Sequence, residues 1–235
     1  MAAETGTVTV VATPIGNLDD LSPRAAKALS SADFWIVEDS RVSAKLQAKI
    51  GVKRPMRVLN DHTPEATVSK YVDEIEAGAS AALLSDAGAP VVSDPGAEIV
   101  DACHRRGIMV DGVPGPSAVT AALALSGFYA QRFAFLGYPP RKAGPLRELL
   151  SQDADSALTL VVFDSPHRIG KLLAACSDAL GKRRYAVCRE LTKVHQQVWR
   201  ARLPDAPTEE QLPHKGEVTL VIEGKRKALA DRAGV

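Results

Sequence analysis

Short apolar runs rich in β-branched residues alternate with amphipathic stretches through the first half of the chain. Each run closes where glycine, proline or an acidic residue follows, which is typical of a buried strand that ends in a turn. The runs cover residues 7–13, 34–37, 81–85 and 108–110. Because helical patterns with short connections separate them, we predict a parallel, doubly wound α/β domain.

Proline-linked start signals predict four helices in this half. Ser22 stands directly before a proline and is expected to cap a helix over residues 22–31. The other three helices open at Thr63-Pro64, Asp94-Pro95 and Pro116. In the first of these, Val68, Val72 and Ile75 fall on one face, as expected of a helix that packs on a sheet.

The second half has a different order of elements. Its predicted strands cover residues 132–136, 157–163, 184–188, 197–201 and 218–222, and its predicted helices cover residues 145–150 and the stretch after Ser165-Pro166. The last strands are too close in sequence for helical crossovers, so a mixed or largely antiparallel sheet is expected. We predict two α/β domains, residues 1–127 and 128–235, because helix gives way to strand near residues 126–130.

Residues 112–131 carry no charge and are long enough to raise the question of a membrane span. Prolines and hydroxyl side chains interrupt this stretch, and Gly115 and Gly127 bracket only about eleven helical residues. A buried helix and no membrane span are therefore predicted. The N-terminus lacks the basic region and apolar run of a signal peptide, and the three cysteines show no C-x-x-C spacing. These features indicate a cytoplasmic protein.

The formal net charge of +1 conceals an asymmetry between the two halves. Residues up to Gly127 include 11 basic and 16 acidic side chains, whereas the rest of the chain includes 18 basic and 12 acidic ones. The second half therefore permits a polyanionic partner, although many ordinary domains carry a similar imbalance.

Three loops that follow predicted strands are rich in glycine and proline. They cover residues 13–17, 85–90 with 93–96, and 113–118. Such loops turn sharply and expose backbone N–H and C=O groups, and Asp86 adds a carboxylate. A plain turn explains any one of them, but three at the carboxyl edge of one sheet favour a ligand site.

Several chemistries lack their sequence signatures. No G-x-G-x-x-G follows the first strand and no G-x-x-x-x-G-K-[ST] occurs, which argues against dinucleotide and P-loop sites. Ser117 lacks the second glycine of a nucleophile elbow, and the five histidines share no metal-binding spacing, so no metal site is expected.

Four polar clusters have two interpretations each. Residues 38–41 form either a local ion pair or part of a site, and residues 139–142 with Arg147 form either a solvated face or a basic contact surface. At residues 165–168, Ser165 is expected to cap a helix, which leaves His167 and Arg168 free to project. Residues 189–195 are either solvated or a substrate-facing cluster.

Taken together, these motifs resemble one family. They are V-A-T-P-I-G-N-L from Val11, E-D-S-R from Glu38, S-D-A-G-A-P from Ser85 with S-D-P-G from Ser93, P-G-P-S-A from Pro114, S-P-H-R from Ser165 and R-E-L-T-K from Arg189. In this order they are similar to the tetrapyrrole methylase superfamily, and within it to the bacterial 16S ribosomal RNA (cytidine-2′-O)-methyltransferases. The resemblance runs from about Val8 to Gly224.

The resemblance implies a two-domain fold, usually a homodimer, that binds S-adenosylmethionine in the cleft between the domains. The implied reaction methylates a cytidine ribose 2′-hydroxyl in the decoding region, on 16S rRNA or the assembled small subunit. No metal is required. By motif position, the cofactor contacts are Pro14, Ile15, Gly16, Asp86, Ala87, Gly88, Ala89, Pro90, Ser117, Ala118, Phe163 and Asp164.

RNA contacts and catalytic groups are assigned from charge and from position at strand ends. The RNA-binding candidates are Arg41, Arg141, Lys142, Arg147, His167 and Arg168. The catalytic candidates are Glu38, Asp39, Glu190 and Lys193, since a ribose hydroxyl benefits from a nearby base or an electrostatic stabiliser. Lys193 is preferred because repulsion from the sulfonium and a basic face is expected to push it towards neutrality.

Two other functions stay open: a methylase of a small tetrapyrrole, and a non-catalytic nucleotide-binding module of the same fold. The sequence also departs from the family. Thr63 follows His62 where Asn is usual, Gln196-Gln197 replace an acidic pair, Tyr138-Pro139-Pro140 replaces Phe-Leu-Pro, and the common C-terminal extension is missing. We expect these changes to affect target placement more than cofactor binding.

Overall fold

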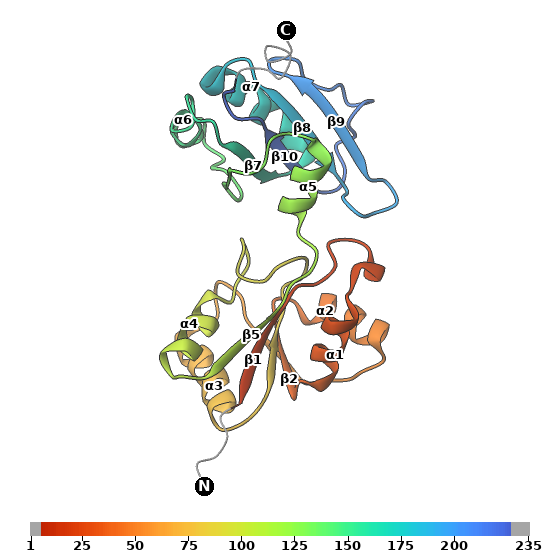
Figure 1. The fold of residues 1–235 in the computed structure, drawn as a ribbon, viewed down its shortest axis with the longest axis vertical. Helices are drawn as coiled ribbons and strands as arrows, with labels where there is room; N and C mark the ends of the chain where they lie inside the picture. The colour runs from red at the N-terminus through yellow and green to blue at the C-terminus, as the bar shows by residue number, and fades with distance from the viewer. Residues whose placement is uncertain (1–5, 227–235) are drawn as a thin grey trace. The chain divides into compact units, whose positions relative to one another are not determined.

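The computed structural model describes residues 6–226. Contacts within the chain divide it into two compact units, Met1–Ser117 and Ala118–Val235. The predicted division falls after Gly127 instead, and the difference is helix α5, Ala118–Ser126. This helix contacts β8 and β10 of the second sheet, so it belongs to the second unit (Figure 1). Among the described residues, no helix is long and apolar enough to cross a bilayer.

The first unit is built on a five-stranded parallel sheet in the order β3-β2-β4-β1-β5. Its strands are β1 Thr7–Val11, β2 Phe34–Val37, β3 Met56–Val58, β4 Ala81–Leu83 and β5 Met109–Val113. Every residue of β2 and β4 is buried, as expected of parallel strands that are covered on both faces. The predicted parallel α/β domain is therefore confirmed.

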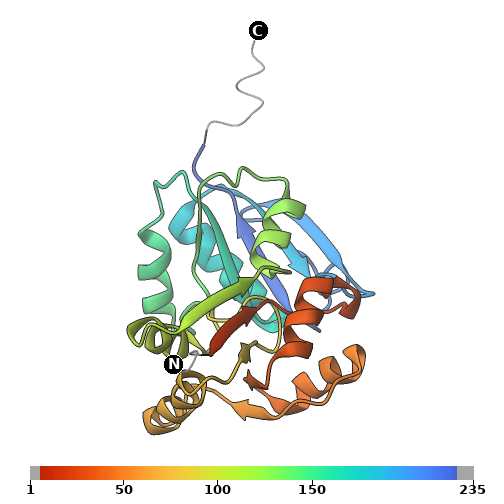
Figure 2. The same ribbon diagram turned by 60° about the horizontal axis from the view of Figure 1, so that its bottom comes forward.

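Helices cover both faces of this sheet, in Figure 1 and again in the turned view of Figure 2. They are η1 Leu18–Asp20, α1 Pro23–Ser31, α2 Ser40–Ile50, α3 Glu65–Glu76 and α4 Ala97–Arg105. Ile36 packs with Val72 of α3 and Ile99 of α4, whereas its neighbour Trp35 packs with Leu29 of α1. This alternation follows the two-residue period of a strand, and it places one apolar core on each face.

Besides the short turn η1, two elements of the first unit were not predicted from the sequence. Helix α2 is capped at its start by Asp39, whose Oδ1 accepts the backbone N–H of Arg41 at 2.8 Å, and at its end by Gly51 with φ 70°. Strand β3 has only three residues, none of them buried, so its apolar pattern is weak. The predicted cap of α1 is confirmed, because Ser22 Oγ accepts the N–H of Ala25 at 3.0 Å.

The second unit has a mixed five-stranded sheet in the order β6-β7-β10-β8-β9. Its strands are β6 Phe133–Phe135, β7 Thr159–Asp164, β8 Arg184–Arg189, β9 Gln197–Arg202 and β10 Val218–Ile222. Only β6 and β7 pair in parallel, and the other three pairs are antiparallel, which confirms the predicted mixed sheet.

Different helices cover the two faces of this second sheet. Helix α6, Ala143–Ser151, and helix α7, Ile169–Leu180, pack on the face that carries Leu160, Tyr185 and Leu220. A short turn, η2 Pro166–Arg168, precedes α7. Helix α5 packs on the opposite face, where Cys188 Sγ lies 3.8 Å from the carbonyl oxygen of Ala122.

Candidate functional site

The loops after β1 and β4 are joined by backbone hydrogen bonds. Thr13 N–H donates to the carbonyl of Gly88 at 2.8 Å, and Gly88 N–H donates back at 3.1 Å. Gly88 has φ 89°, and a Cβ there would lie 3.3 Å from Ile15 Cγ2. The close approach of the two loops therefore requires glycine at position 88.

The third predicted loop lies at the same edge of the sheet. A Cβ on Gly115 would lie 3.0 Å from the Cβ of Ala12, directly after β1. The carbonyl oxygen of Pro116 lies 3.8 Å from the corresponding position on Gly88. The structure thus brings together the three loops that contain the first-unit cofactor candidates. The cofactor candidates of the first two loops differ in exposure. Those that are buried are Pro14, Ile15, Gly88 and Pro90, and those that are exposed are Gly16 and Ala87.

Three half-buried carboxylates lie at this edge of the first unit. Burial raises the pKa of Glu38, and the charges of Asp86 and Asp94 raise it further. Burial is also the main cause of the raised pKa of Asp86 and of Asp94. The Oδ1 of Asp86 accepts the backbone N–H of Asp39 at 3.2 Å. Such a cluster repels added negative charge and attracts a cationic ligand. Among the residues that the structure describes, no group of three His, Cys, Asp or Glu could hold a metal ion.

Asp39 and Arg41 form a local ion pair, with Arg41 Nη2 2.6 Å from Asp39 Oδ2. Hydrogen bonds from the side chain and the backbone of Arg41 lower the pKa of Asp39 to about 2. Of the two interpretations of residues 38–41, the local ion pair holds for Asp39 and Arg41, whereas Glu38 belongs to the carboxylate cluster with Asp86 and Asp94. Asp39 caps α2 and is a weak base, whereas the side chain of Arg41 is 89% exposed.

In the second unit, Asp164 ends β7 with a side chain that is only 2% exposed. Its Oδ1 accepts the N–H of Ser165 at 2.7 Å and lies 3.4 Å from Arg168 Nη1. Its Oδ2 has no hydrogen-bond partner within the described part of the chain. A buried carboxylate oxygen without a partner is costly, so this atom is suited to accept a hydrogen bond from a ligand. The neighbouring Phe163 packs its ring 4.7 Å from that of Phe135.

The expectation for residues 165–168 needs correction. Ser165 makes no side-chain cap, and the α-helix begins only at Ile169, after the η2 turn. Arg168 does not project freely, because its Nη2 donates to the carbonyl of Pro140 at 3.2 Å and its Nη1 lies near Asp164. The guanidinium of Arg168 is thus held between Pro140 and Asp164, where it positions the Asp164 carboxylate.

Lys193 lies between two carboxylates after β8. Its Nζ is 2.9 Å from Glu190 Oε1 and 2.8 Å from Glu217 Oε2. Burial alone lowers the pKa of Lys193, but hydrogen bonds to Glu217 and Glu190 outweigh it, and the net pKa is raised. The expectation that repulsion makes Lys193 neutral is therefore wrong, because it did not foresee Glu217. The ammonium stays charged at neutral pH.

The turn that carries this ion triad has an unusual backbone. Glu190 has φ 50° and Thr192 has φ 65°, and residues other than glycine rarely adopt this left-handed region. Burial acts to raise the pKa of Glu190, but Lys193 and the backbone of Glu217 lower it overall. Since Val218 pairs with both Asp164 and Arg189, the triad and Asp164 lie at the same end of the sheet.

The remaining RNA-binding candidates lie on the surface of the second unit. Arg141 and Lys142 precede α6, and Arg147 lies on it; all three are exposed. The exposed ring of His167 lies 5.6 Å from the ring of His214. Exposure at these positions fits a phosphate-contacting surface and a solvated face equally well.

Sequence reasoning missed Glu217 and Gly216. Both precede β10, more than twenty residues from Glu190, and no spacing rule connects them.

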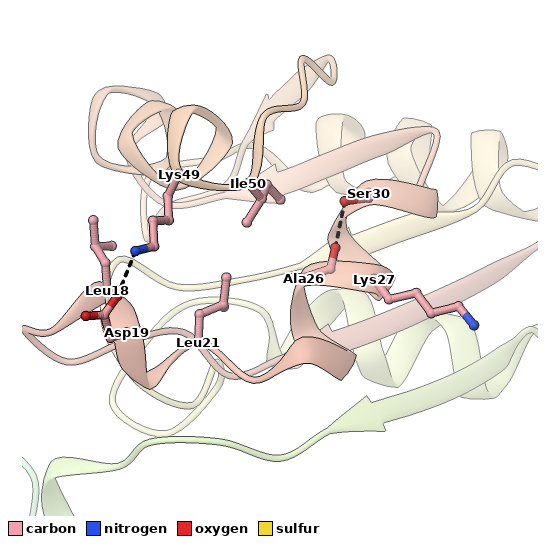
Figure 3. A pocket seen from close by; sticks show the side chains of 8 residues that line it. All are labelled: Leu18, Asp19, Leu21, Ala26, Lys27, Ser30, Lys49 and Ile50. Carbon is pink, nitrogen blue, oxygen red and sulfur yellow. Dashed lines mark hydrogen bonds and ion pairs between the residues drawn. The ribbon is translucent and has the colours of Figure 1, made fainter.

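Figure 3 shows a separate pocket of about 440 Å³ in the helical layer of the first unit. Its apolar lining comes from Leu18, Leu21 and Ile50. Two charged lining residues form an ion pair, with Lys49 Nζ 2.7 Å from Asp19 Oδ1. It contains none of the predicted site residues. Its one remaining cation, Lys27, does not make it a ligand site.

Comparison with known proteins gives one consistent relationship. Residues 7–207 match the family Tetrapyrrole (Corrin/Porphyrin) Methylases. The chain is 38% identical over 221 residues to a protein of Thermotoga maritima named ribosomal RNA small subunit methyltransferase I, covering 94% of this chain and 99% of that one. It is 40% identical over 222 residues to the protein of that name from Mycobacterium tuberculosis strain H37Rv, covering 93% and 78%.

Solved structures with the same fold are more distant in sequence. The crystal structure of diphthine synthase superposes with a TM-score of 0.71 at 15% identity, covering 96% of this chain and 92% of that one. That of the methyltransferase CobJ gives 0.69 at 18% identity, with 95% and 98% covered. At these identities the likeness concerns the fold alone.

Proposed function

The chain belongs to the tetrapyrrole (corrin/porphyrin) methylase family, and from this premise we propose that it transfers a methyl group from S-adenosylmethionine to ribosomal RNA of the small subunit. The observation that carries the proposal is the 38–40% identity to small-subunit rRNA methyltransferases over 93–94% of the chain. The finer proposal, from the motif resemblance, is that the acceptor is a cytidine ribose 2′-hydroxyl in the decoding region and that the enzyme is a homodimer.

The described residues fit such a methyl donor. S-adenosylmethionine carries a sulfonium and an ammonium, and the half-buried carboxylates Glu38, Asp86 and Asp94 favour a cation at the sheet edge of the first unit. The joined loops around Thr13 and Gly88 place backbone polar groups at that edge. In the second unit, the unpartnered Oδ2 of Asp164 provides a buried acceptor.

The bound donor supplies an activated methyl group that needs no metal and no covalent enzyme intermediate. The protein therefore has to align the acceptor hydroxyl and accept its proton. Of the two catalytic candidates in the first unit, Glu38 is the better proton acceptor, because its raised pKa makes it a stronger base than Asp39. Lys193 stays charged and is suited to stabilise a developing alkoxide or to hold a phosphate.

The test is methyl transfer from labelled S-adenosylmethionine to small subunits that lack the modification, followed by mapping of the modified nucleotide. Uroporphyrinogen III serves as the competing small-molecule acceptor. Label on a ribose of small-subunit rRNA supports the proposal, and its position tests the finer one. Label on the tetrapyrrole, or donor binding without any turnover, contradicts it. Sedimentation equilibrium of the same preparation tests the homodimer.

A further inference from the structure

A second arginine-rich surface lies on the second unit, away from the basic residues considered so far. It is a pocket of about 360 Å³ lined by Phe128, Arg184, Arg200, Ala201 and Arg202, which we call the arginine pocket. Arg184 pairs directly with Arg202 across β8 and β9, and Ala186 pairs with Arg200. Residues paired in this way share a face, so all three guanidinium groups project from the face that carries α5.

Phe128 holds two of these guanidinium groups in place. The Cζ of Arg184 lies 5.1 Å from the centroid of its ring, and the Cζ of Arg200 lies 5.0 Å from it. Phe128 itself is fixed, because its N–H donates to Ser126 Oγ at 3.1 Å directly after α5. Phe128 is only 7% exposed, so its ring serves as a platform for cations and is closed to a stacking base.

The charges of the pocket are only partly neutralised. Arg184 is committed to Glu223, since its Nε donates to Oε2 at 2.6 Å and its Nη2 to Oε1. No carboxylate within residues 6–226 pairs with Arg200 or Arg202, and both side chains are exposed. Two guanidinium groups without a carboxylate partner in the described residues line one pocket, and guanidinium groups are suited in charge and in hydrogen-bond donors to bind a phosphate.

The arginine pocket lies at the opposite end of the sheet from Asp164 and Lys193. Strand β8 runs from Arg184, beside the pocket, to Arg189, beside the ion triad. Five residues of strand separate the two ends by about 17 Å at about 3.3 Å per residue. A ligand that contacts both ends must therefore be extended, as an RNA strand is and a compact macrocycle is not.

We propose that the arginine pocket binds a backbone phosphate of the RNA substrate, at a nucleotide distant from the one that is methylated. This inference rests on the proposed function, because it takes RNA as the substrate. It differs from the sequence-based surface around Arg141 and Arg168 in its position and in its residues. Its contribution is to affinity and placement, with no part in the chemical step.

The test removes the two free charges in the variant Arg200→Gln/Arg202→Gln of the full chain. The probes are a 16S rRNA transcript and small subunits that lack the modification, and binding is measured across a salt series. We expect at least a tenfold loss of affinity near physiological salt. The slope of log affinity against log salt should become shallower by about 0.7 for one single-strand phosphate. Donor affinity and the single-turnover rate at saturating RNA should stay at the wild-type level.

Two further variants serve as controls. Lys53→Gln/Lys70→Gln removes two exposed charges from the first unit and should leave both RNA affinity and slope unchanged. Arg200→Lys/Arg202→Lys keeps both positive charges but loses the planar guanidinium, which can donate two parallel hydrogen bonds to a phosphate. This variant should recover most of the salt slope but only part of the affinity.

Each outcome decides between the inference and the proposed function. If the Arg200→Gln/Arg202→Gln variant binds RNA with unchanged affinity and salt slope while the wild-type protein methylates rRNA, only the inference about the arginine pocket is overturned. If the variant binds RNA more weakly but the wild-type protein never methylates rRNA, RNA binding at the arginine pocket is supported and the proposed methyl transfer is overturned. If wild-type protein binds no RNA, both fail. A change of mass in sedimentation equilibrium with unchanged RNA affinity assigns the pocket to a contact between copies and overturns the inference.

Discussion

The carboxyl group of Glu190 lies where a side chain on residue 216 would have to be: a Cβ on Gly216 would come within 2.4 Å of Glu190 Oε1. The N–H of Glu217 donates to the same oxygen at 2.9 Å. Gly216 also has φ 96°, a conformation that disfavours any side chain. The absence of a side chain at position 216 therefore allows the triad of Glu190, Lys193 and Glu217 to form.

Substitution of this glycine should disrupt the triad. Gly216→Ala is expected to lower the free energy of unfolding by about 1–3 kcal/mol through overpacking and backbone strain, and to reduce methyl transfer. Denaturant unfolding and single-turnover assays measure the two effects. Gly170→Ala is the matched control, because a Cβ there meets nothing within 4 Å on helix α7 and should stabilise slightly. Wild-type stability and activity in Gly216→Ala would show that the loop rearranges freely.

The charge of Lys193 gives a second prediction. Because its pKa is raised, Lys193→Met should reduce the rate at every pH near neutrality, whereas Lys193→Arg should retain part of it. Glu217→Gln removes one partner and should shift the loss of lysine charge to lower pH. Single-turnover rates from pH 6 to beyond the ordinary lysine pKa of 10.5 test this. A Lys193→Met variant with the wild-type rate would exclude the lysine from the reaction.

The sequence predicted the strands better than it predicted the site. β2 and β10 were found from their apolar runs, because burial on both faces leaves a clear signal in composition. Helix α2 was missed because its start, Glu38 to Arg41, was interpreted only as a charged cluster, although Asp39 also serves as an N-cap.

The site residues differ in how far sequence could place them. The loop of Asp86 was predictable, since the carboxyl end of a parallel strand is where ligands bind. The partner of Lys193 was not, because Glu217 reaches it only through antiparallel pairing of β8 with β10. Contacts between residues distant in sequence depend on strand register, which the apolar pattern alone did not specify.

Asp86 should affect cofactor affinity and stability in opposite directions. Burial raises its pKa, so at pH 7 its charge is less well stabilised in the folded chain than in the unfolded chain. Asp86→Asn keeps an acceptor for the N–H of Asp39, and is expected to raise the melting temperature at pH 7. The same variant should weaken S-adenosylmethionine binding by about 1–3 kcal/mol, the range for a lost charged hydrogen bond.

Calorimetry and thermal unfolding measure the two effects of Asp86→Asn. Asp111→Asn removes an exposed carboxylate from the same unit and serves as the control. Unchanged donor affinity in a folded Asp86→Asn variant would remove Asp86 from the cofactor site.

Asp164 offers a related test in the second unit. Asp164→Asn retains one oxygen but replaces the other by an amide N–H₂, so the unpartnered acceptor can be lost and Arg168 loses its ionic partner. Donor affinity should fall about tenfold, equivalent to about 1.4 kcal/mol. Arg168→Gln should weaken it less, since the guanidinium acts through the carboxylate. Equal losses in both variants, with a lower melting temperature in each, would indicate a purely structural ion pair.

Glu38 should give opposite pH dependences for stability and for rate. Burial and the charges of Asp86 and Asp94 raise its pKa, so the folded state binds its proton at a pH where the unfolded chain has already released it. Stability linked to this group is therefore gained as pH falls through the folded pKa towards the unfolded one, and is lost as pH rises through the folded pKa. As a proton acceptor, however, Glu38 works only when ionised, so the rate should fall as pH falls through the same pKa.

In Glu38→Gln both dependences should disappear together, with a rate lower by about 10²–10⁴-fold, the usual contribution of a general base. The measurements are thermal unfolding and single-turnover methylation at saturating donor and RNA between pH 4.5 and 8. A variant that loses the stability dependence but keeps the wild-type rate profile would show that Glu38 is buried for structural reasons alone.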